Sequence, residues 1–282
     1  MREDFAVFIL SHGRANDVKT LSTLNKCGYS GKWYIIIDNE DSQIDEYYKN
    51  FNEHIIVFNK YEVSLEMDAF DLSNNRNTVV YARNVCFKVA ESLGLDYFLE
   101  LDDDYVRFEF RVGQGEKLLT YEMLNIDEVI NAMIEFLNDS NALCVAFAQG
   151  GDLIGGVNGS KFKQRVLRKA MNSFFCKTSR PFKFIGRINE DVNTYTTLGS
   201  RGELFFTLTN MDLIQVPTQQ QKGGMSESYL DVGTYYKSFY TIMTMPSCVK
   251  IATVGDQHAR IHHSIVWENC VPKIISGRFK HE

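Results

Sequence analysis

Three consecutive aspartates, Asp102, Asp103 and Asp104, directly follow an apolar segment at residues 97–101. Adjacent carboxylates repel one another, so their ionised forms need a cation or solvent to neutralise them. Carboxylate oxygens suit Mg²⁺ and Mn²⁺, and such an ion also binds the oxygens of a phosphate or diphosphate. A solvated acidic turn is the alternative. Because a buried strand is expected just before the acids, we favour a site for a divalent metal and a diphosphate.

Two further polar clusters follow apolar segments in the same way. Ser11, His12, Gly13 and Arg14 come after residues 5–10 (FAVFIL). The second cluster, Asp38-Asn39-Glu40-Asp41, comes after residues 33–37 (WYIII). In an open parallel sheet, ligands bind outside the carboxyl ends of the strands. We therefore expect both clusters to lie at one edge of the sheet together with the three aspartates.

The elements that must position these residues alternate between apolar runs and amphipathic stretches, which predicts an α/β fold. Expected strands cover residues 5–10, 33–37, 55–58, 97–101 and 143–148, and expected helices cover residues 16–27, 75–93 and 127–137. Residues 105–112 and 117–123 should form a hairpin. Residues 149–159, with five glycines, and residues 219–226 are expected to be mobile loops that close over donor or acceptor.

Composition bounds the answer further. The chain has 282 residues, 44% of them hydrophobic and 23% charged, with four prolines and no obvious linker, which favours a single domain over residues 1–282. The longest apolar run, residues 142–148, is far shorter than the roughly twenty residues of a membrane-spanning helix. Acids at positions 3 and 4 do not suit an export signal, so we expect a cytoplasmic protein without a membrane span.

The six cysteines are far apart, which disfavours disulfides and metal-thiolate sites. Oligomeric state is unknown at this level.

Phosphate-binding glycine motifs are absent from the sequence. Neither GxxxxGK[ST] nor a GxGxxG after the first expected strand occurs, which disfavours NTPases, kinases and dehydrogenases. An α/β enzyme that binds a diphosphate through a metal at an acidic strand end remains, which is how nucleotide sugars are bound.

A longer pattern supports this interpretation. Ala82-Arg83-Asn84, Ala90, Gly94, Asp96-Tyr97 and Leu101 to Asp104 together resemble the ARN...A...G-DY...LDDD stretch of GT-A glycosyltransferases. The resemblance covers about the first 110 residues. It implies a Rossmann-like mixed sheet flanked by helices, with residues 1–110 as the nucleotide-sugar half and 111–282 as the acceptor half.

The same resemblance implies roles for single residues. Ser11, His12, Gly13, Arg14 and Asp38 would line the uracil and ribose pocket of a UDP-sugar. Arg83 would lie near the diphosphate, although a surface salt bridge is the alternative. Asp102 and Asp104 would be the acids of the DxD motif, with Asp103 beside the donor and Asp104 as the best ligand for Mn²⁺ or Mg²⁺.

In the second half, Asn189-Glu190-Asp191 resembles the xED motif that supplies the catalytic base of inverting members. Asp191 would take the proton of the acceptor hydroxyl, with Glu190 beside it. Acids are also favoured at helix N-termini, so a capping role is the alternative, and both roles can hold together.

Three of the six histidines, His258, His262 and His263, lie close together near the end of the sequence. A late histidine commonly completes the metal site of GT-A enzymes, so the resemblance implies His263 or, second, His262 as a ligand. Adjacent residues of a strand point to opposite faces, so only one should face the metal. Lys273 could reach the diphosphate, but a solvated lysine is the commoner case.

Residues 161–187 carry nine basic residues and no acidic one. Because the whole chain carries −6 and this segment +9, the remainder carries −15. The cations are Lys161, Lys163, Arg165, Arg168, Lys169, Lys177, Arg180, Lys183 and Arg187. Clustered cations bind phosphate backbones, and the interleaved Phe162, Phe174, Phe175, Phe182 and Phe184 could stack on bases. The segment therefore predicts a DNA-binding face. Alternatives are core phenylalanines with a solvated charged face, or contact with an anionic lipid or acidic glycan.

Together with this half, residues 189–207 and 260–275 resemble the phage DNA-modifying glycosyltransferases related to the base J glucosyltransferase. That resemblance implies transfer of a hexose, glucose from UDP-glucose, to 5-hydroxymethyluracil or 5-hydroxymethylcytosine in DNA, with inversion, in the host cytoplasm. The base would have to leave the stack to reach Asp191. Two alternatives stay open: a GT-A enzyme acting on a glycan or protein, and a non-catalytic nucleic-acid-binding module on a transferase fold.

Overall fold

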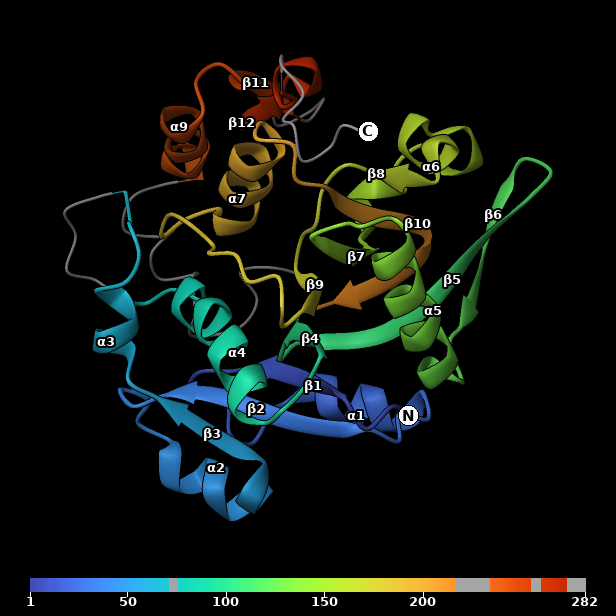
Figure 1. Ribbon diagram of the computed structural model, residues 1–282. Helices are drawn as coiled ribbons and strands as arrows, with labels where there is room; N and C mark the ends of the chain where they lie inside the picture. The colour runs from blue at the N-terminus through green and yellow to red at the C-terminus, as the bar shows by residue number, and fades with distance from the viewer. Residues whose placement is uncertain (71–75, 217–233, 255–259, 273–282) are drawn as a thin grey trace, which may run out of the picture.

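The computed structural model describes residues 1–70, 76–216, 234–254 and 260–272 (Figure 1). Its strands are β1 (Phe5–Leu10), β2 (Lys32–Asp38), β3 (Ile55–Phe58), β4 (Tyr97–Asp102), β5 (Tyr105–Gln114), β6 (Lys117–Glu122), β7 (Cys144–Ala148), β8 (Val166–Leu167), β9 (Ser173–Lys177), β10 (Phe205–Gln215), β11 (Val249–Val254) and β12 (Arg260–Ile265). Its α-helices are α1 (Lys19–Lys26), α2 (Ile44–Phe51), α3 (Lys60–Ser64), α4 (Val80–Ser92), α5 (Ile126–Asp139), α6 (Ser160–Gln164), α7 (Glu190–Gly199) and α9 (Thr234–Thr244). Short 3₁₀ turns are η1 (Asn52–His54), η2 (Gly150–Asp152), η3 (Gly156–Asn158) and η4 (Trp267–Asn269).

One mixed sheet of ten strands forms the centre of the molecule. Its order is β3-β2-β1-β4-β9-β7-β10-β5-β6, and the short β8 pairs with β10 beside this path. The strands β1 to β4 are parallel to their neighbours among themselves. From β9 onward, every pair except β7 with β10 is antiparallel. The first half of the chain is therefore a parallel sheet, to which the second half adds antiparallel strands.

Helices cover both faces of this sheet. In β1, Phe5, Val7 and Ile9 pack in one apolar cluster, whereas Ala6, Phe8 and Leu10 pack in the other. The first cluster also contains buried residues of α1, α2 and α5, and the second contains those of α4 and α7. Because both faces are covered, the strand is apolar along its whole length, as parallel strands usually are. The predicted α/β class, a mixed sheet flanked by helices, is confirmed.

Most predicted elements match the structure in type. The strands at residues 5–10 and 55–58 have the expected bounds, and the hairpin of β5 and β6 pairs Glu109 with Glu122 through to Gln114 with Lys117. The helix expected at 75–93 begins only at Val80. A turn at residues 76–79 precedes it, in which the Thr78 hydroxyl donates to the carbonyl of Arg187 (2.7 Å).

The expected loop at residues 149–159 contains regular structure. It forms η2 and η3, and η2 begins with a capping box between Gln149 and Asp152. Glycine is needed at residue 155, where φ is +88° and the chain approaches Gly159 closely. The second expected loop, residues 219–226, lies outside the described residues.

Two C-terminal strands form a separate sheet. β11 pairs with β12 in antiparallel fashion and packs against α9, with Cys248, Val249 and Cys270 in a small core of their own. All six cysteines are free and buried. Among the described residues, none of the helices combines the length and the apolar character that crossing a bilayer requires.

Candidate active site

The carboxyl ends of β1 and β4 meet, as predicted from their polar clusters. Leu10 lies beside Asp102 in the parallel register of these two strands. The Ser11 hydroxyl donates to Asp103 Oδ2 (2.6 Å), and Arg14 Nη1 pairs with Asp103 Oδ1 (2.5 Å). Asp103 is 3% exposed, and burial raises its pKa, while Arg14 and Ser11 oppose the rise. Asp103 therefore ties the loop after β1 to the end of β4.

The end of β2 joins the same edge through Asp38. Its Oδ2 lies 2.8 Å from His12 Nδ1 and 3.2 Å from Lys60 Nζ. Although burial favours the neutral acid, His12 and Lys60 hold the pKa of Asp38 below its usual value. The hydrogen bond to Asp38 correspondingly raises the pKa of His12. All three predicted polar clusters thus lie together at one edge of the sheet.

Two further residues belong to this edge: Asp41, which lies in the predicted cluster but was given no role, and Lys60, which the sequence argument missed. Asp41 is 4% exposed and accepts a hydrogen bond from the Gly13 backbone (2.7 Å). Lys60, 3% exposed, begins α3 directly after β3. The rule that parallel strands end at the ligand edge, applied to residues 55–58, would have found Lys60.

Asp102 and Asp104 alternate with Asp103 along the chain, and both are half-buried where Asp103 is buried. Burial, followed by the charges of Asp102 and Asp103, raises the pKa of Asp104 to about 7. Among the described residues, no ion pair includes Asp104, although Arg83 neutralises Asp102 and Arg14 neutralises Asp103. Asp104 is therefore the acid whose ionised form most needs a further cation.

This donor set fits a divalent metal bound together with a phosphorylated ligand. No three His, Cys, Asp or Glu side chains within the described ranges converge closely enough to hold a metal ion alone. Mg²⁺ is usually held by one or two carboxylates together with substrate phosphates and water, and does not need a protein cage. Asp102 and Asp104 supply this kind of incomplete, all-oxygen site.

Arg83 joins the aspartates to the second acidic motif. Its guanidinium lies 3.0 Å from Asp102 Oδ1 and 3.0 Å from Glu190 Oε1, and 3.8 Å from Glu100 Oε2. The rings of Phe174 and Phe184 flank it, with centroids 4.7 Å and 5.9 Å from Cζ. Although burial alone would lower it, these acids raise the pKa of Arg83. Because Arg83 is 2% exposed, the alternative of a surface salt bridge is excluded.

Glu190 and Asp191 form the first turn of α7, so their helix-terminal position is confirmed. Burial raises the pKa of Glu190, and Arg83 opposes this rise. Burial likewise raises the pKa of Asp191, opposed by the Val192 backbone N–H (2.7 Å from Oδ1) and by the charges of nearby cations. The two acids thus have different partners: Glu190 is the counter-ion of Arg83, whereas among the described residues no ion pair includes Asp191.

Two lysines from distant parts of the chain lie near Asp191. Lys237 of α9 and Lys169 both lower its pKa through their positive charge. Lys169 is itself paired with the buried Asp152, and burial lowers the pKa of Lys169. Lys169, predicted to bind DNA, is therefore part of the surroundings of Asp191.

His262 and His263 lie in β12, opposite Ala252 and Ile251 of β11. Their ring centroids are 4.4 Å apart. His262 Nδ1 donates to the His263 carbonyl oxygen (2.7 Å), which turns its ring along the strand. Burial, with His262 and Lys237, lowers the pKa of His263 to about 4. Neither histidine joins Asp102 and Asp104 in a metal-binding group of the described residues. His258 and Lys273 lie outside those residues.

The phenylalanines interleaved with the basic residues belong to the core. Phe162, Phe174, Phe175, Phe182 and Phe184 are between 0% and 9% exposed. The prediction that they stack on bases is wrong, because the covered sheet and α4 require apolar residues here, and the alternative of core phenylalanines is correct.

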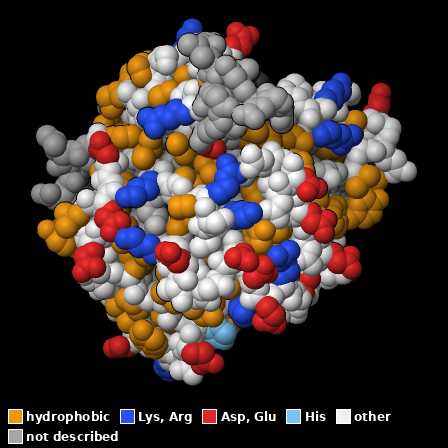
Figure 2. Space-filling model, in the orientation of Figure 1, with side chains coloured by type: hydrophobic (Ala, Val, Ile, Leu, Met, Phe, Trp, Pro, Cys, Tyr) orange, Lys and Arg blue, Asp and Glu red, His pale blue; other side chains and the backbone are white. Residues whose placement is uncertain are grey.

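The nine cations do not form one face. Arg187 is 6% exposed, which corrects its prediction as a DNA contact. Arg180 pairs with Glu203 (3.3 Å), and Lys183 contacts Glu66 next to α3. Figure 1 shows α3 and α6 on opposite sides of the molecule, and Figure 2 shows basic and acidic side chains interspersed on this face. Lys163 of α6, Arg165 directly after α6 and Arg168 directly after β8 are exposed, however, and no ion pair among the described residues includes them.

The fold and this edge define an α/β protein with two acidic motifs joined by a buried arginine. Residues 5–224 match the model of the TET-Associated Glycosyltransferase family, and the chain therefore belongs to this family of enzymes. It is a glycosyltransferase. No curated protein matches the chain.

Many solved structures are similar to this chain, and two of them serve as examples. One is glucosyl-3-phosphoglycerate synthase from Mycobacterium tuberculosis in complex with Mn²⁺, UDP and phosphoglyceric acid, with 9% identity and a TM-score of 0.48, covering 93% of this chain and 87% of that one. The other is GalNAc-T7 with UDP, GalNAc and Mn²⁺, with 14% identity and a TM-score of 0.42, covering 86% of this chain. The match spans 51% of the GalNAc-T7 chain.

Proposed function

We propose that this protein is a metal-dependent glycosyltransferase of GT-A type that transfers a hexose, glucose from UDP-glucose, to the hydroxyl of 5-hydroxymethyluracil or 5-hydroxymethylcytosine in DNA, with inversion. One observation carries the proposal. Arg83 pairs with both Asp102 and Glu190, so the acids suited to a metal and diphosphate lie next to the acids suited to activate an acceptor.

The donor binds at the edge formed by β1, β2 and β4. Asp38, held by His12 and Lys60, lies at the end of β2, where it accepts hydrogen bonds from a ribose or uracil. Asp102 and Asp104 hold Mn²⁺ or Mg²⁺. That ion, when bound, stabilises the negative charge of the departing diphosphate.

Asp191 activates the acceptor. It takes the proton of the hydroxymethyl group while the hydroxyl oxygen forms a bond to the anomeric carbon and the bond from that carbon to the diphosphate breaks. Burial raises the pKa of Asp191, which makes its carboxylate a stronger base than an exposed aspartate. Glu190 does not take the proton, because it is the counter-ion of Arg83. Attack from the side opposite the diphosphate inverts the anomeric carbon.

DNA reaches this site along α6 and β8. The support is the exposed Lys163, Arg165 and Arg168, the description of the family, and the resemblance to phage DNA-modifying enzymes. A base in a duplex cannot reach the buried Asp191, which is 8% exposed, so the target base leaves the stack.

The acceptor is tested by measuring UDP release from UDP-glucose with Mn²⁺. Duplexes of one sequence that contain 5-hydroxymethyluracil, 5-hydroxymethylcytosine or the unmodified pyrimidine are compared with a reaction without DNA. We expect release with at least one hydroxymethylated duplex, together with a mass gain of one hexose on that strand. Equal release in all reactions would contradict the DNA acceptor, and transfer to a glycan or protein in its place would support the alternative acceptor class. Absence of UDP release with UDP-glucose, UDP-galactose and UDP-N-acetylhexosamines alike would contradict the proposed donor.

A further inference from the structure

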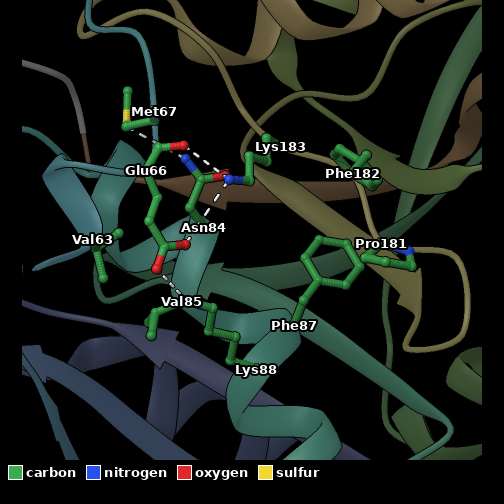
Figure 3. A pocket seen from close by; sticks show the side chains of 10 residues that line it. All are labelled: Val63, Glu66, Met67, Asn84, Val85, Phe87, Lys88, Pro181, Phe182 and Lys183. Atoms are coloured by element: carbon green, nitrogen blue, oxygen red, sulfur yellow. Dashed lines mark hydrogen bonds and ion pairs between the residues drawn. The ribbon is translucent and has the colours of Figure 1, made fainter.

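A cavity of about 250 Å³ lies between α3, α4 and residues 181–183 (Figure 3). None of the strand-end acids lines it. Its walls are Val63, Glu66, Met67, Asn84, Val85, Phe87, Lys88, Pro181, Phe182 and Lys183. The cavity is thus separate from the site described above, and nothing in the proposed reaction uses it.

The inner wall of this cavity is apolar. Phe87 and Phe182 meet edge to face with their ring centroids 5.1 Å apart, and Val85 lies beside them. These three side chains are between 7% and 9% exposed, so the little surface they retain faces the cavity. Such a wall favours an apolar group of the size of a substituted benzene ring.

The rim of the cavity carries two cations and one acid. Lys88 Nζ lies 2.5 Å from Glu66 Oε1, and Lys183 Nζ donates to the Glu66 backbone carbonyl (2.8 Å) while lying 3.9 Å from Glu66 Oε2. All three side chains are exposed, with fractions of 61%, 60% and 44% for Lys88, Lys183 and Glu66. Exposed ion pairs contribute little to stability, so an incoming anion can replace the Glu66 carboxylate at low cost.

We propose that this cavity binds a small amphipathic anion, namely an aromatic or branched apolar group that carries one carboxylate or sulfonate. The apolar group contacts Phe87, Phe182 and Val85. The anionic group lies at the rim between Lys88 and Lys183. Because the rim has two cations for one acid, a bound monoanion leaves it neutral.

The cavity is connected to the active site through Asn84. Its side chain donates to the Phe184 carbonyl (2.9 Å) and accepts from the Phe184 backbone N–H (2.8 Å). Arg83, the preceding residue of α4, contacts Glu190, and residues 184–189 lead directly into that motif. A ligand that separates α4 from residues 181–184 therefore changes the geometry of the Arg83–Glu190 pair and lowers turnover.

Binding is tested without any enzyme activity, by calorimetric titration of the full chain with 4-phenylbutyrate and with the uncharged 4-phenylbutanol. We expect the acid to bind at least tenfold more tightly than the alcohol. Lys88→Ala with Lys183→Ala should abolish this difference, and Glu66→Gln should tighten acid binding because it removes the competing carboxylate. Lys49→Ala on α2, another exposed lysine paired with a glutamate, is the matched control and should change nothing.

Two results would overturn the site. The first is equal affinity for acid and alcohol, and the second is unchanged acid binding in Val63→Phe, a substitution that fills the cavity. A thermal melt of Val63→Phe separates lost binding from lost folding.

The connection to the active site is tested by UDP release in the presence of saturating 4-phenylbutyrate. We expect at least a twofold loss of kcat in the wild type, and none in Val63→Phe, in which the added ring fills the cavity. Binding without this loss would overturn the connection. Absence of UDP release under all conditions would count against the proposed function alone, because the calorimetric result stands apart from it.

Discussion

The acids at the ends of β2 and β4 and the cations of residues 161–187 are two sets of like charges, and the fold distributes them differently. The acids come from segments more than 60 residues apart in the chain, yet Asp38 and Asp103 lie at one edge of the sheet, each held by its own cation. The cations are close in sequence but spread over α6, the residues that flank β8, β9 and the approach to α7. Parallel strands bring their ends together, whereas a segment that changes direction several times spreads its side chains.

This comparison places the reaction at the acidic edge and leaves only part of the basic segment for DNA binding.

The largest expected effect is the loss of kcat on substitution of Asp191. Replacing it with asparagine removes the base but keeps the size of the side chain, so kcat should fall by roughly 10²–10⁴-fold, the usual contribution of a general base. The KM for the donor should change little. Asp45→Asn, an exposed aspartate in the first turn of α2, is the matched control. A loss of less than tenfold in Asp191→Asn would contradict the assignment.

The second expected effect is on folding. Arg83→Met leaves Asp102 and Glu190 without their buried cation, and removing one partner of such a pair costs about 3–5 kcal/mol. Arg83→Lys keeps the charge but cannot contact both Asp102 and Glu190, so its loss should be smaller. Urea unfolding measures both. If both variants were as stable as the wild type, the conclusion that Arg83 joins the two acidic motifs would be contradicted.

The stability of the metal-free protein should depend on pH through Asp104. Its folded pKa of about 7 lies above the ordinary value, so in metal-free protein the neutral acid is favoured and stability falls as pH rises from about 4 to about 7. Asp104→Asn lacks this loss. The melting temperature of Asp104→Asn minus that of the wild type, without metal, should therefore be larger at pH 8 than at pH 5. A constant difference would mean that Asp104 is not held near its neighbours.

The smallest expected effect is on DNA binding, and it should differ between two pairs of cations in the basic segment. If Lys163 and Arg165 each contact one phosphate, replacing both with alanine should make the slope of log K for DNA binding against log salt concentration shallower by about 2. Each lost phosphate contact contributes about 0.9 to that slope. Lys177→Ala with Arg180→Ala changes the same number of charges within the same segment and should leave that slope unchanged. Equal changes of the slope in the two double variants would support the original prediction of a single DNA-binding face.

Sequence alone predicted the acidic edge because it rests on short-range patterns. An apolar run followed by polar residues marks a strand end, and parallel strands place such ends together without further information. The same rule would have included Lys60, which follows β3, and Asp41, which lies within a cluster already recognised.

The second half could not be predicted in this way, because its contacts are long-range and its strands are mostly antiparallel. Nothing near residue 83 shows that Arg83 would pair with an acid 107 positions later. The apolar character of Phe174 and Phe184 fits a core as well as a stacking face, and only the covering helix decides between them. His262 bonds to the backbone carbonyl of His263 and their ring centroids lie 4.4 Å apart, local contacts that strand alternation does not predict.

The most direct test of the acidic edge as the donor site is calorimetric titration of the wild type with UDP, with and without Mn²⁺. Asp104→Asn and the Lys163→Ala, Arg165→Ala double variant are titrated in the same way. We predict binding that requires Mn²⁺, that is lost in Asp104→Asn, and that is unchanged in the double variant. UDP binding that does not require Mn²⁺ and persists in Asp104→Asn would contradict the account.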